Sequence, residues 1–280
     1  MLRKLIAHDF RCTWKLSVTL FVTSMVAALL AMTCGIALYN FPDVEEYSIQ
    51  MNLAYAGLDL GEALFSMLAY LSAGATLLLS AVHYYKKMLS DEAYLTFTLP
   101  ATAGQHLFSK MVMGSVWTLV GCIVLFFDSI AMEIPMALEW ADSPYNDDMY
   151  MDMFVDEGIV TIYNSPAFWI GIILLIVAML ITQLALIYLA LTIGGVIANK
   201  HKAVAGVALY WFGNSIVTFI MVITAVLTSA IIVSFIPESA ITDNGAIIAI
   251  LYICSIVVAG FGVLYYFLNR MLLTRKLNLS

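Results

Sequence analysis

One polar stretch between two long apolar runs carries the residue types most suited to chemistry or to binding. Residues 83–110 hold three lysines, two adjacent carboxylates, several aromatic side chains and a proline. Lysines and carboxylates can form ion pairs with another protein, and leucine or aromatic side chains can fill an apolar groove on it. This mixture indicates a surface that meets a partner protein. The competing interpretation is an ordinary loop that rests on lipid headgroups.

The local pattern predicts a short helix in the middle of this stretch. Ser90 can cap a helix start, and Asp91 and Glu92 then lie near the positive end of the helix dipole. Pro100 disfavours helical geometry at Leu99, so we expect a helix of only about two turns. A hydroxyl at the start, acids in the first turn and a proline at the end together define a separate element.

A second helix start follows directly. Thr102 precedes Gln105 by three residues, which is the spacing of a capping box that opens the next apolar run. In the short helix, Leu95 and Leu99 are four residues apart and therefore share one face. The two acids and these two leucines are the side chains that we expect to face a partner.

The residues of this stretch also resemble a known family. Ser90-Asp-Glu-Ala-Tyr-Leu-Thr-Phe-Thr-Leu-Pro100, followed by Gln105-His-Leu-Phe-Ser-Lys110, is similar to the segment after the second membrane helix of bacterial ABC-2 type permeases. Members of that family often have Val-Ser where this chain has Ala101-Thr102, which is a mild change. The remaining chain resembles the family only through the number and lengths of its apolar runs.

The resemblance implies a function and its partners. In ABC-2 permeases this run forms the intracellular coupling helix, which docks on a separate ATP-binding-cassette ATPase. ATP and Mg would be bound by that ATPase and no cofactor by this chain, which is then not an enzyme by itself. A second permease, identical or different, would complete the substrate path, and export is favoured because the resemblance is to exporters. The coupling residues that it implies are Asp91, Glu92, Tyr94, Leu95, Thr96, Phe97, Leu99 and Pro100.

Composition independently indicates a membrane protein. Of 280 residues, 63% are hydrophobic and only 11% are charged, and the mean hydropathy is +0.96. A soluble chain carries about a quarter charged residues. We therefore expect membrane lipid around the chain and no nucleic-acid partner. The net charge of −7 reflects acidic loops on one side of the membrane and does not indicate a soluble acidic protein.

The apolar runs predict an all-α integral membrane protein, with one transmembrane domain over residues 1–280. Residues 1–15 form a basic amphipathic pattern, which predicts a helix lying on the cytoplasmic leaflet. Each later run can cross a hydrocarbon core of about 30 Å, because a helix rises about 1.5 Å per residue. We expect spans over residues 16–38, 63–82, 111–130, 169–197, 203–232 and 246–268.

The charges predict the orientation of these spans. Residues 40–62, 131–165 and 237–245 contain no Lys or Arg, whereas all twelve basic residues lie in the N-terminal segment, loop 83–110, turn 199–202 and the tail from residue 269. Fifteen of the nineteen acids lie in the first three segments or at their edges. The positive-inside rule places both termini and loop 83–110 in the cytoplasm. We expect a multi-pass protein of the bacterial inner membrane.

A few polar residues within the spans are candidates for the substrate path. Asp128 lies near the outer end of the third span, where we expect it to reach the headgroups. Gln183 and Asn214 lie deeper, and interhelical hydrogen bonding is the main alternative for both. Close helix packing is the expected role of Gly206, Gly213, Gly260 and Gly262.

Other chemistry has weaker signals. The chain has no G-x-x-x-x-G-K-[ST] loop for ATP, and its four cysteines lack metal or redox spacing, so we expect neither a metal site nor a disulfide. In the acidic loop 131–165, alternating methionines from Met149 to Met153 suggest copper(I), but their neighbours are hard acidic ligands. An acidic vestibule for a cationic substrate and plain solvation of an outer loop are the other readings of this segment.

The hypothesis that follows is a permease subunit of an ABC exporter, driven by a separate ATPase. One alternative is a non-transporting membrane protein that confers immunity or senses a ligand through the acidic loop. Another is an ion-coupled carrier, which the scarcity of ionisable groups at mid-membrane depth disfavours. The sequence does not name the cargo.

Overall fold

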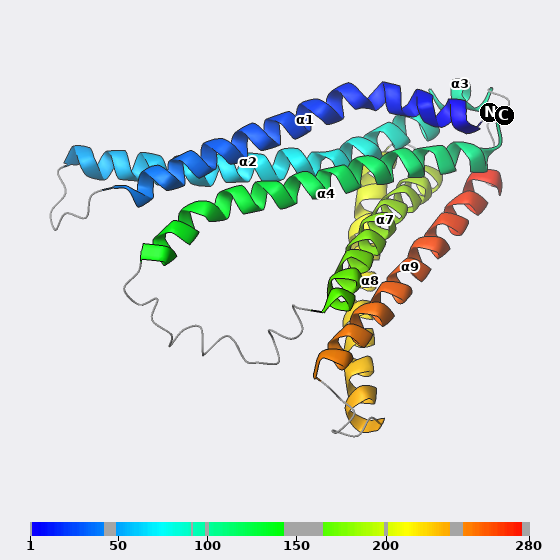
Figure 1. Cartoon of the computed structure of the whole chain (residues 1–280). Helices are drawn as coiled ribbons and strands as arrows, with labels where there is room; N and C mark the ends of the chain where they lie inside the picture. The colour runs from blue at the N-terminus through cyan, green and yellow to red at the C-terminus, as the bar shows by residue number, and fades with distance from the viewer. Residues whose placement is uncertain are drawn as a thin grey trace. The chain divides into compact units, whose positions relative to one another are not determined.

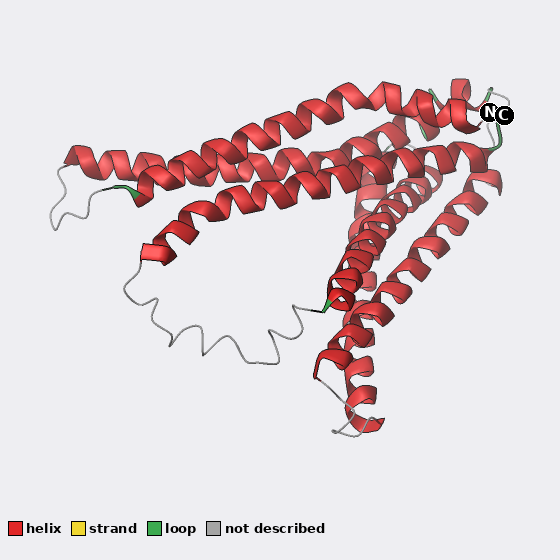
Figure 2. Ribbon diagram, viewed as in Figure 1, coloured by secondary structure: helices red, strands yellow, loops and turns green. Residues whose placement is uncertain are grey.

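The structure, a computed structural model of the chain, describes residues 2–41, 49–90, 92–98, 101–142, 165–198, 201–235 and 243–275. These residues are almost entirely helical and contain no strand (Figure 2). Six of the described helices are long and apolar enough to cross a membrane. The expected all-α chain with six membrane-length helices is therefore confirmed.

Six long helices and one short helix make up the described chain (Figure 1). The short one, α3, has five residues and follows the second long helix. In chain order the elements are α1 Leu2–Tyr39, α2 Ile49–Met88, α3 Ala93–Phe97, α4 Ala103–Asp142, α7 Pro166–Ile197, α8 Lys202–Phe235 and α9 Asp243–Arg275.

Several helices extend beyond the apolar runs that predicted them. The expected interfacial helix over residues 1–15 and the expected span over 16–38 form one continuous helix in the structure. Helix α2 begins at Ile49, inside the predicted loop 40–62, and α4 continues to Asp142, inside the predicted loop 131–165. Helix α9 likewise includes residues 269–275 of the predicted tail. Hydropathy marks contact with hydrocarbon, but backbone hydrogen bonding continues a helix into water.

The two longest helices exceed the thickness of a bilayer. At a rise of about 1.5 Å per residue, a 40-residue helix is about 60 Å long, roughly twice a hydrocarbon core of about 30 Å. Helix α4 contains Pro135, which removes one backbone donor from the helix. Part of α2 and of α4 must therefore extend beyond the bilayer or tilt within it.

The described chain divides into two compact units. One comprises residues 10–79 and 116–153, and the other comprises residues 1–9, 80–115 and 154–280. In the first unit, α1, α2 and α4 lie side by side (Figure 1). Ala27, Ala28 and Ala69 form a small-residue core between α1 and α2. Such residues let helix backbones approach closely.

In the other unit, α7 is the central helix and packs against both α8 and α9. Residues 184–192 of α7 are buried without interruption. A side-chain carbon added at Gly194 would lie 2.7 Å from the Cα of Gly206 and 2.8 Å from the carbonyl oxygen of Lys202. The α7–α8 contact therefore depends on the absence of side chains at this crossing.

Three of the four glycines predicted to permit close packing have close neighbours, and one does not. A Cβ at Gly213 would meet Leu186 at 3.0 Å, and one at Gly262 would meet the Thr182 hydroxyl at 2.7 Å. Together with Gly206 they confirm the expected close packing. No described atom lies within 4 Å of a Cβ added at Gly260, so the same prediction is wrong for Gly260. The sequence could not separate the two glycines of α9, because only the direction of each from the helix axis distinguishes them.

The outer faces of the long helices are apolar. On α8, Trp211, Phe219 and Val226 are exposed to 73%, 66% and 59%. Contiguous apolar surface of this kind is not stable in water and marks contact with lipid or another protein. Helix length and apolar surface together support a multi-pass membrane protein.

Candidate functional site

The segment between α2 and α4 is the predicted site, and it contains the short helix α3 over Ala93–Phe97. Its N-cap residue is Glu92, which makes no side-chain cap hydrogen bond. The Ser90 hydroxyl donates instead to the Lys86 carbonyl at 2.5 Å, one turn earlier. The prediction that Ser90 caps this helix is therefore wrong. Its side chain serves the last turn of α2, whose terminal carbonyls lack intrahelical donors.

Glu92 is held by a neighbour on α2. The Lys87 ammonium donates to a Glu92 carboxylate oxygen at 2.8 Å, and both side chains are partly exposed. The hydrogen bond from Lys87, with its positive charge, lowers the pKa of the Glu92 carboxyl below its ordinary value. An exposed pair of this kind contributes little to stability. The sequence predicts a Glu92 carboxylate that faces a partner protein, whereas in the structure it pairs with Lys87. A basic residue of a partner would therefore have to displace Lys87.

The other residues of the predicted coupling set are only partly described. The Tyr94 side chain is 65% exposed, and the Thr96 hydroxyl donates to the Glu92 carbonyl at 3.3 Å. The side chains of Leu95 and Phe97 lie outside the described part of the structure, as do Asp91, Leu99 and Pro100. Within the described part, Tyr94 is the exposed aromatic side chain of α3.

The capping box that opens α4 is confirmed. The Gln105 backbone nitrogen donates to the Thr102 hydroxyl oxygen at 3.3 Å, and the Thr102 nitrogen donates to the Gln105 side-chain oxygen at 3.1 Å. Helix α4 begins between them at Ala103. These reciprocal bonds fix where the segment containing α3 ends and α4 starts.

Close to this segment lies a buried charged cluster that sequence reasoning missed. Asp9 of α1 accepts hydrogen bonds from Lys110 and from the Ser109 hydroxyl, the latter at 2.6 Å. His83 of α2 lies 3.5 Å from the same carboxylate. Asp9 and Lys110 are each 2% exposed. A buried ion pair of this kind is retained only with good geometry and further hydrogen bonds, and Ser109 supplies one.

A second buried network joins the same helix ends to α7 and α9. The rings of Tyr84 and Tyr188 stack at 4.2 Å with an angle of 7°. The Tyr84 hydroxyl lies 2.6 Å from the Thr192 hydroxyl and donates to the Asn269 side-chain oxygen at 3.3 Å. Thr192 also donates to Asn269 at 2.8 Å. Three helices therefore share one hydrogen-bonded contact.

Tyr188 connects the network to both helices that flank α3. Its hydroxyl lies within hydrogen-bonding distance of the Ser80 carbonyl on α2, at 3.4 Å, and of the Lys110 carbonyl on α4, at 3.3 Å. A Cβ at Gly114 would lie 2.6 Å from the same hydroxyl, so glycine makes room for it. The last turns of α2 and the first turns of α4 are consequently fixed to α7 by one side chain.

The deeper polar residues of the predicted path pair with each other. The Gln183 amide donates to the Asn214 side-chain oxygen at 2.8 Å, joining α7 and α8. The Tyr210 hydroxyl donates to the Gln183 oxygen at 3.1 Å. The interhelical role expected as the main alternative is therefore confirmed, since each amide already has a protein partner.

Asp128 does not occupy the position that the sequence suggested. Its carboxylate is 2% exposed and accepts a hydrogen bond from the Ser24 hydroxyl of α1. The Ser24 hydroxyl also lies 2.9 Å from the Ala69 carbonyl of α2. The expectation that Asp128 faces the headgroups is wrong, because α1 and α2 cover the face of α4 on which it lies.

Metal chemistry finds no support in the described part of the chain. No group of three or more His, Cys, Asp or Glu side chains there is arranged to hold a metal ion. The methionines from Met149 to Met153, and residues 143–164 of the acidic loop in general, lie outside the described residues.

Comparison of the chain with protein-family models, with curated proteins and with solved structures gives no match in any of the three.

Proposed function

We propose that the chain is the permease subunit of an ATP-binding-cassette exporter, driven by a separate ATPase. The observation that carries the proposal is α3, a five-residue helix between two membrane-length helices of 40 residues each. It lies in the segment whose residues resemble the coupling helix of ABC-2 permeases. The exposed Tyr94 supports contact with another protein.

The predicted orientation supports the same role. All twelve basic residues lie in segments that the positive-inside rule assigns to the cytoplasm, and α3 lies within one of them. Both termini are then cytoplasmic, and the membrane is the inner membrane of a bacterium. ATP and Mg are bound by the partner, and a second permease, identical or different, completes the substrate path.

The contacts around α3 suggest how motion of the ATPase reaches the membrane helices. The segment is bounded by the end of α2 and the start of α4, and Tyr188 of α7 contacts backbone on both. The charged cluster of Asp9 and Lys110 adds α1 to the same joint. A displacement of α3 therefore moves four helices together, because packed interiors transmit strain.

The test reverses the charges of the coupling segment. Asp91→Lys combined with Glu92→Lys adds repulsion toward a basic partner, and Leu95→Ala removes an apolar anchor that costs on the order of 2 kcal/mol if it is a hot spot. We expect normal membrane insertion, reduced co-purification of an ATP-hydrolysing partner in mild detergent, and loss of its stimulated ATP hydrolysis. Each purified variant is compared with wild type by the amount of ATPase recovered in a pull-down and by the rate of phosphate release from ATP.

Two controls separate partner binding from internal effects. Lys87→Gln breaks the internal pair with Glu92 but keeps both acids, so it should retain the ATPase. Leu53→Ala shortens a leucine of α2 that is 74% exposed, and it should also retain the ATPase. If the charge-reversed and Leu95→Ala chains keep their ATPase and its activity, the segment is not the coupling element and the proposal fails.

A second candidate, an ion-coupled carrier, is favoured by one specific observation. Asp128 is a buried carboxylate on a membrane-length helix, and such groups commonly mark ion paths. In liposomes containing a pH-sensitive dye, a carrier would move protons without ATP, and Asp128→Asn would abolish that movement. Proton movement equal to that of empty liposomes would exclude this candidate.

A further inference from the structure

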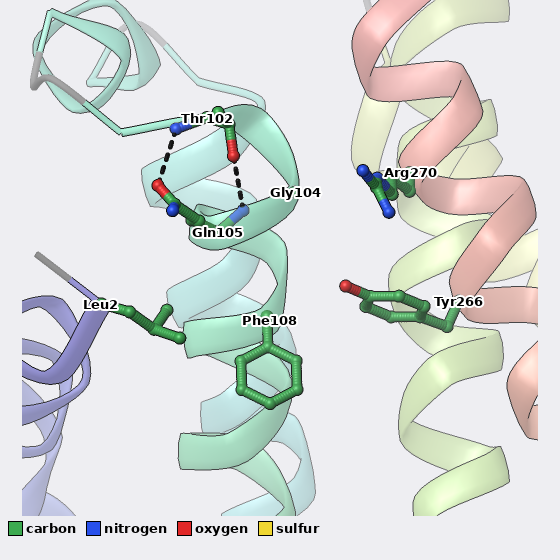
Figure 3. A pocket seen from close by; sticks show the side chains of 7 residues that line it. All are labelled: Leu2, Thr102, Gly104, Gln105, Phe108, Tyr266 and Arg270. Carbon is green, nitrogen blue, oxygen red and sulfur yellow. Dashed lines mark hydrogen bonds between the residues drawn. The ribbon is translucent and has the colours of Figure 1, made fainter.

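A pocket of about 410 Å³ lies where the ends of three membrane-length helices meet. Its walls come from the first turn of α1, the first turns of α4 and the last turns of α9 (Figure 3). Arg270 and Tyr266, one turn apart on α9, extend toward the start of α4 (Figure 3). The lining residues are Leu2, Thr102, Gly104, Gln105, Phe108, Tyr266 and Arg270.

The described residues that line the pocket carry positive charge and include no acid. Arg270 is the one charged side chain among the described residues that line it. Arg270 makes no ion pair within the described part of the chain, where every ion pair involves Asp9 or Glu92. Two more basic residues, Arg3 and Lys4, follow Leu2 directly and are exposed. An anion in the pocket would therefore meet an unopposed guanidinium in a positive local field.

Hydrogen-bond donors accompany this charge. The Gln105 oxygen accepts from the Thr102 backbone, and the amide nitrogen of Gln105 makes no hydrogen bond with a described residue. The Tyr266 hydroxyl likewise makes no hydrogen bond with any residue that the structure describes. The capping box already uses the backbone donors of Thr102 and Gln105. Recognition of an anion would thus rest on the side chains of Arg270, Gln105 and Tyr266.

Gly104 keeps the pocket open. A Cβ added at this position would lie 3.1 Å from the Arg270 Nε atom and 3.6 Å from both its Cδ and Cζ atoms. That separation is tight, but the Arg270 side chain is flexible and can move away. A side chain at position 104 would therefore push the guanidinium aside and take up space in the pocket without displacing backbone.

The depth and polarity of the pocket indicate what kind of molecule carries the anion. Its walls belong to the ends of three candidate spans, Leu2–Tyr39, Ala103–Leu138 and Ile247–Thr274. The ends of helices that cross a bilayer lie at or beyond its headgroups, where basic side chains can meet anionic lipid. Leu2 and Phe108 add an apolar wall (Figure 3). Basic pockets between membrane helices suit anionic lipid headgroups.

We propose that this pocket binds the phosphate group of an anionic phospholipid, with Arg270 as its charged ligand. Gln105 and Tyr266 donate further hydrogen bonds to the phosphate oxygens, and Leu2 and Phe108 contact the upper part of an acyl chain. The proposal requires only that the chain lies in a membrane, and it holds whether or not the chain is a permease.

The experiment measures lipid binding to the full-length chain by native mass spectrometry in detergent. Phosphatidylglycerol and phosphatidylcholine are titrated separately onto delipidated protein. Wild type should bind phosphatidylglycerol more tightly than phosphatidylcholine. Arg270→Gln should weaken phosphatidylglycerol binding about tenfold, as expected for losing one charge-assisted hydrogen bond. Gly104→Leu, which keeps the charge and fills the pocket, should do the same.

The matched control is Arg11→Gln, which removes the same charge from an exposed arginine of α1 that does not line the pocket. It should bind phosphatidylglycerol as wild type does. A further arm adds millimolar inorganic phosphate, which should not displace the lipid. Equal binding of both lipids by wild type would overturn the proposal, as would unchanged binding in Arg270→Gln or in Gly104→Leu. If inorganic phosphate displaces the lipid, the proposed lipid ligand is wrong and the pocket is a site for soluble phosphate.

Discussion

Lys110 of α4 donates a hydrogen bond to Asp9 of α1 across 101 positions of sequence, and both side chains are buried. This pair joins the first turns of two helices that are far apart in the chain. Ser109 and His83 contact the same carboxylate, so three helices meet at Asp9.

Breaking this pair should destabilise the protein strongly. Asp9→Asn leaves the buried Lys110 ammonium without its counter-charge, and such a loss typically costs about 3–5 kcal/mol. Unfolding in increasing fractions of SDS, followed by circular dichroism, measures the change. Asp9→Asn combined with Lys110→Met should be less damaging than the sum of the single changes, because the pair acts as a unit.

The exposed pair supplies the control for that prediction. Glu92→Gln removes the partner of Lys87 at the surface and should leave the unfolding transition unchanged. If Asp9→Asn changes the unfolding transition no more than Glu92→Gln does, the buried pair of Asp9 and Lys110 does not stabilise the fold.

Removing the Tyr84 hydroxyl should have a moderate effect. Tyr84→Phe deletes contacts with Thr192 and Asn269, but those two residues keep their own hydrogen bond. We expect a loss of about 1 kcal/mol, the usual net value of one buried hydrogen bond. The same SDS titration checks it, and Tyr94→Phe on the exposed face of α3 is the matched control. A larger effect from Tyr94→Phe would contradict the assignment of the buried network.

The α7–α8 crossing should reject any side chain. Gly194→Ala places a methyl group against backbone atoms of Gly206 and Lys202, and overpacking of this kind costs about 1–3 kcal/mol. Gly260→Ala has open space and should be neutral or slightly stabilising, since alanine favours a helix by about 1 kcal/mol over glycine. Thermal aggregation in detergent compares the two. Equal behaviour of both variants would refute the close approach at Gly194.

Orientation is tested by cysteine labelling from outside intact cells. A cysteine at Ser143, in the acidic segment without basic residues, should react with an impermeant thiol reagent, and one at Lys200 should not. The background lacks the native cysteines, because Cys12 is exposed in the structure. Reversed labelling would overturn the cytoplasmic position of loop 83–110 and with it the proposed contact with an ATPase.

The sequence alone determined the elements with a local origin. Apolar runs identified six membrane-length helices, because about 20 consecutive apolar residues suffice to cross a bilayer. The pair Thr102 and Gln105 predicted the start of α4, since a capping box involves only residues three apart. A short helix between α2 and α4 was expected for similar local reasons.

Only the tertiary structure decided which polar residues are buried and with what partners. Asp9 lies in the segment predicted to form a basic interfacial helix, and Lys110 lies in the loop predicted to meet a partner protein. Only helix packing brings the two side chains together. Asp128 was expected at the headgroups, but α1 and α2 cover it. Hydropathy and spacing describe one helix at a time, whereas burial depends on the direction in which each helix face meets its neighbours. For the same reason Gly260 and Gly262, two residues apart, have opposite surroundings.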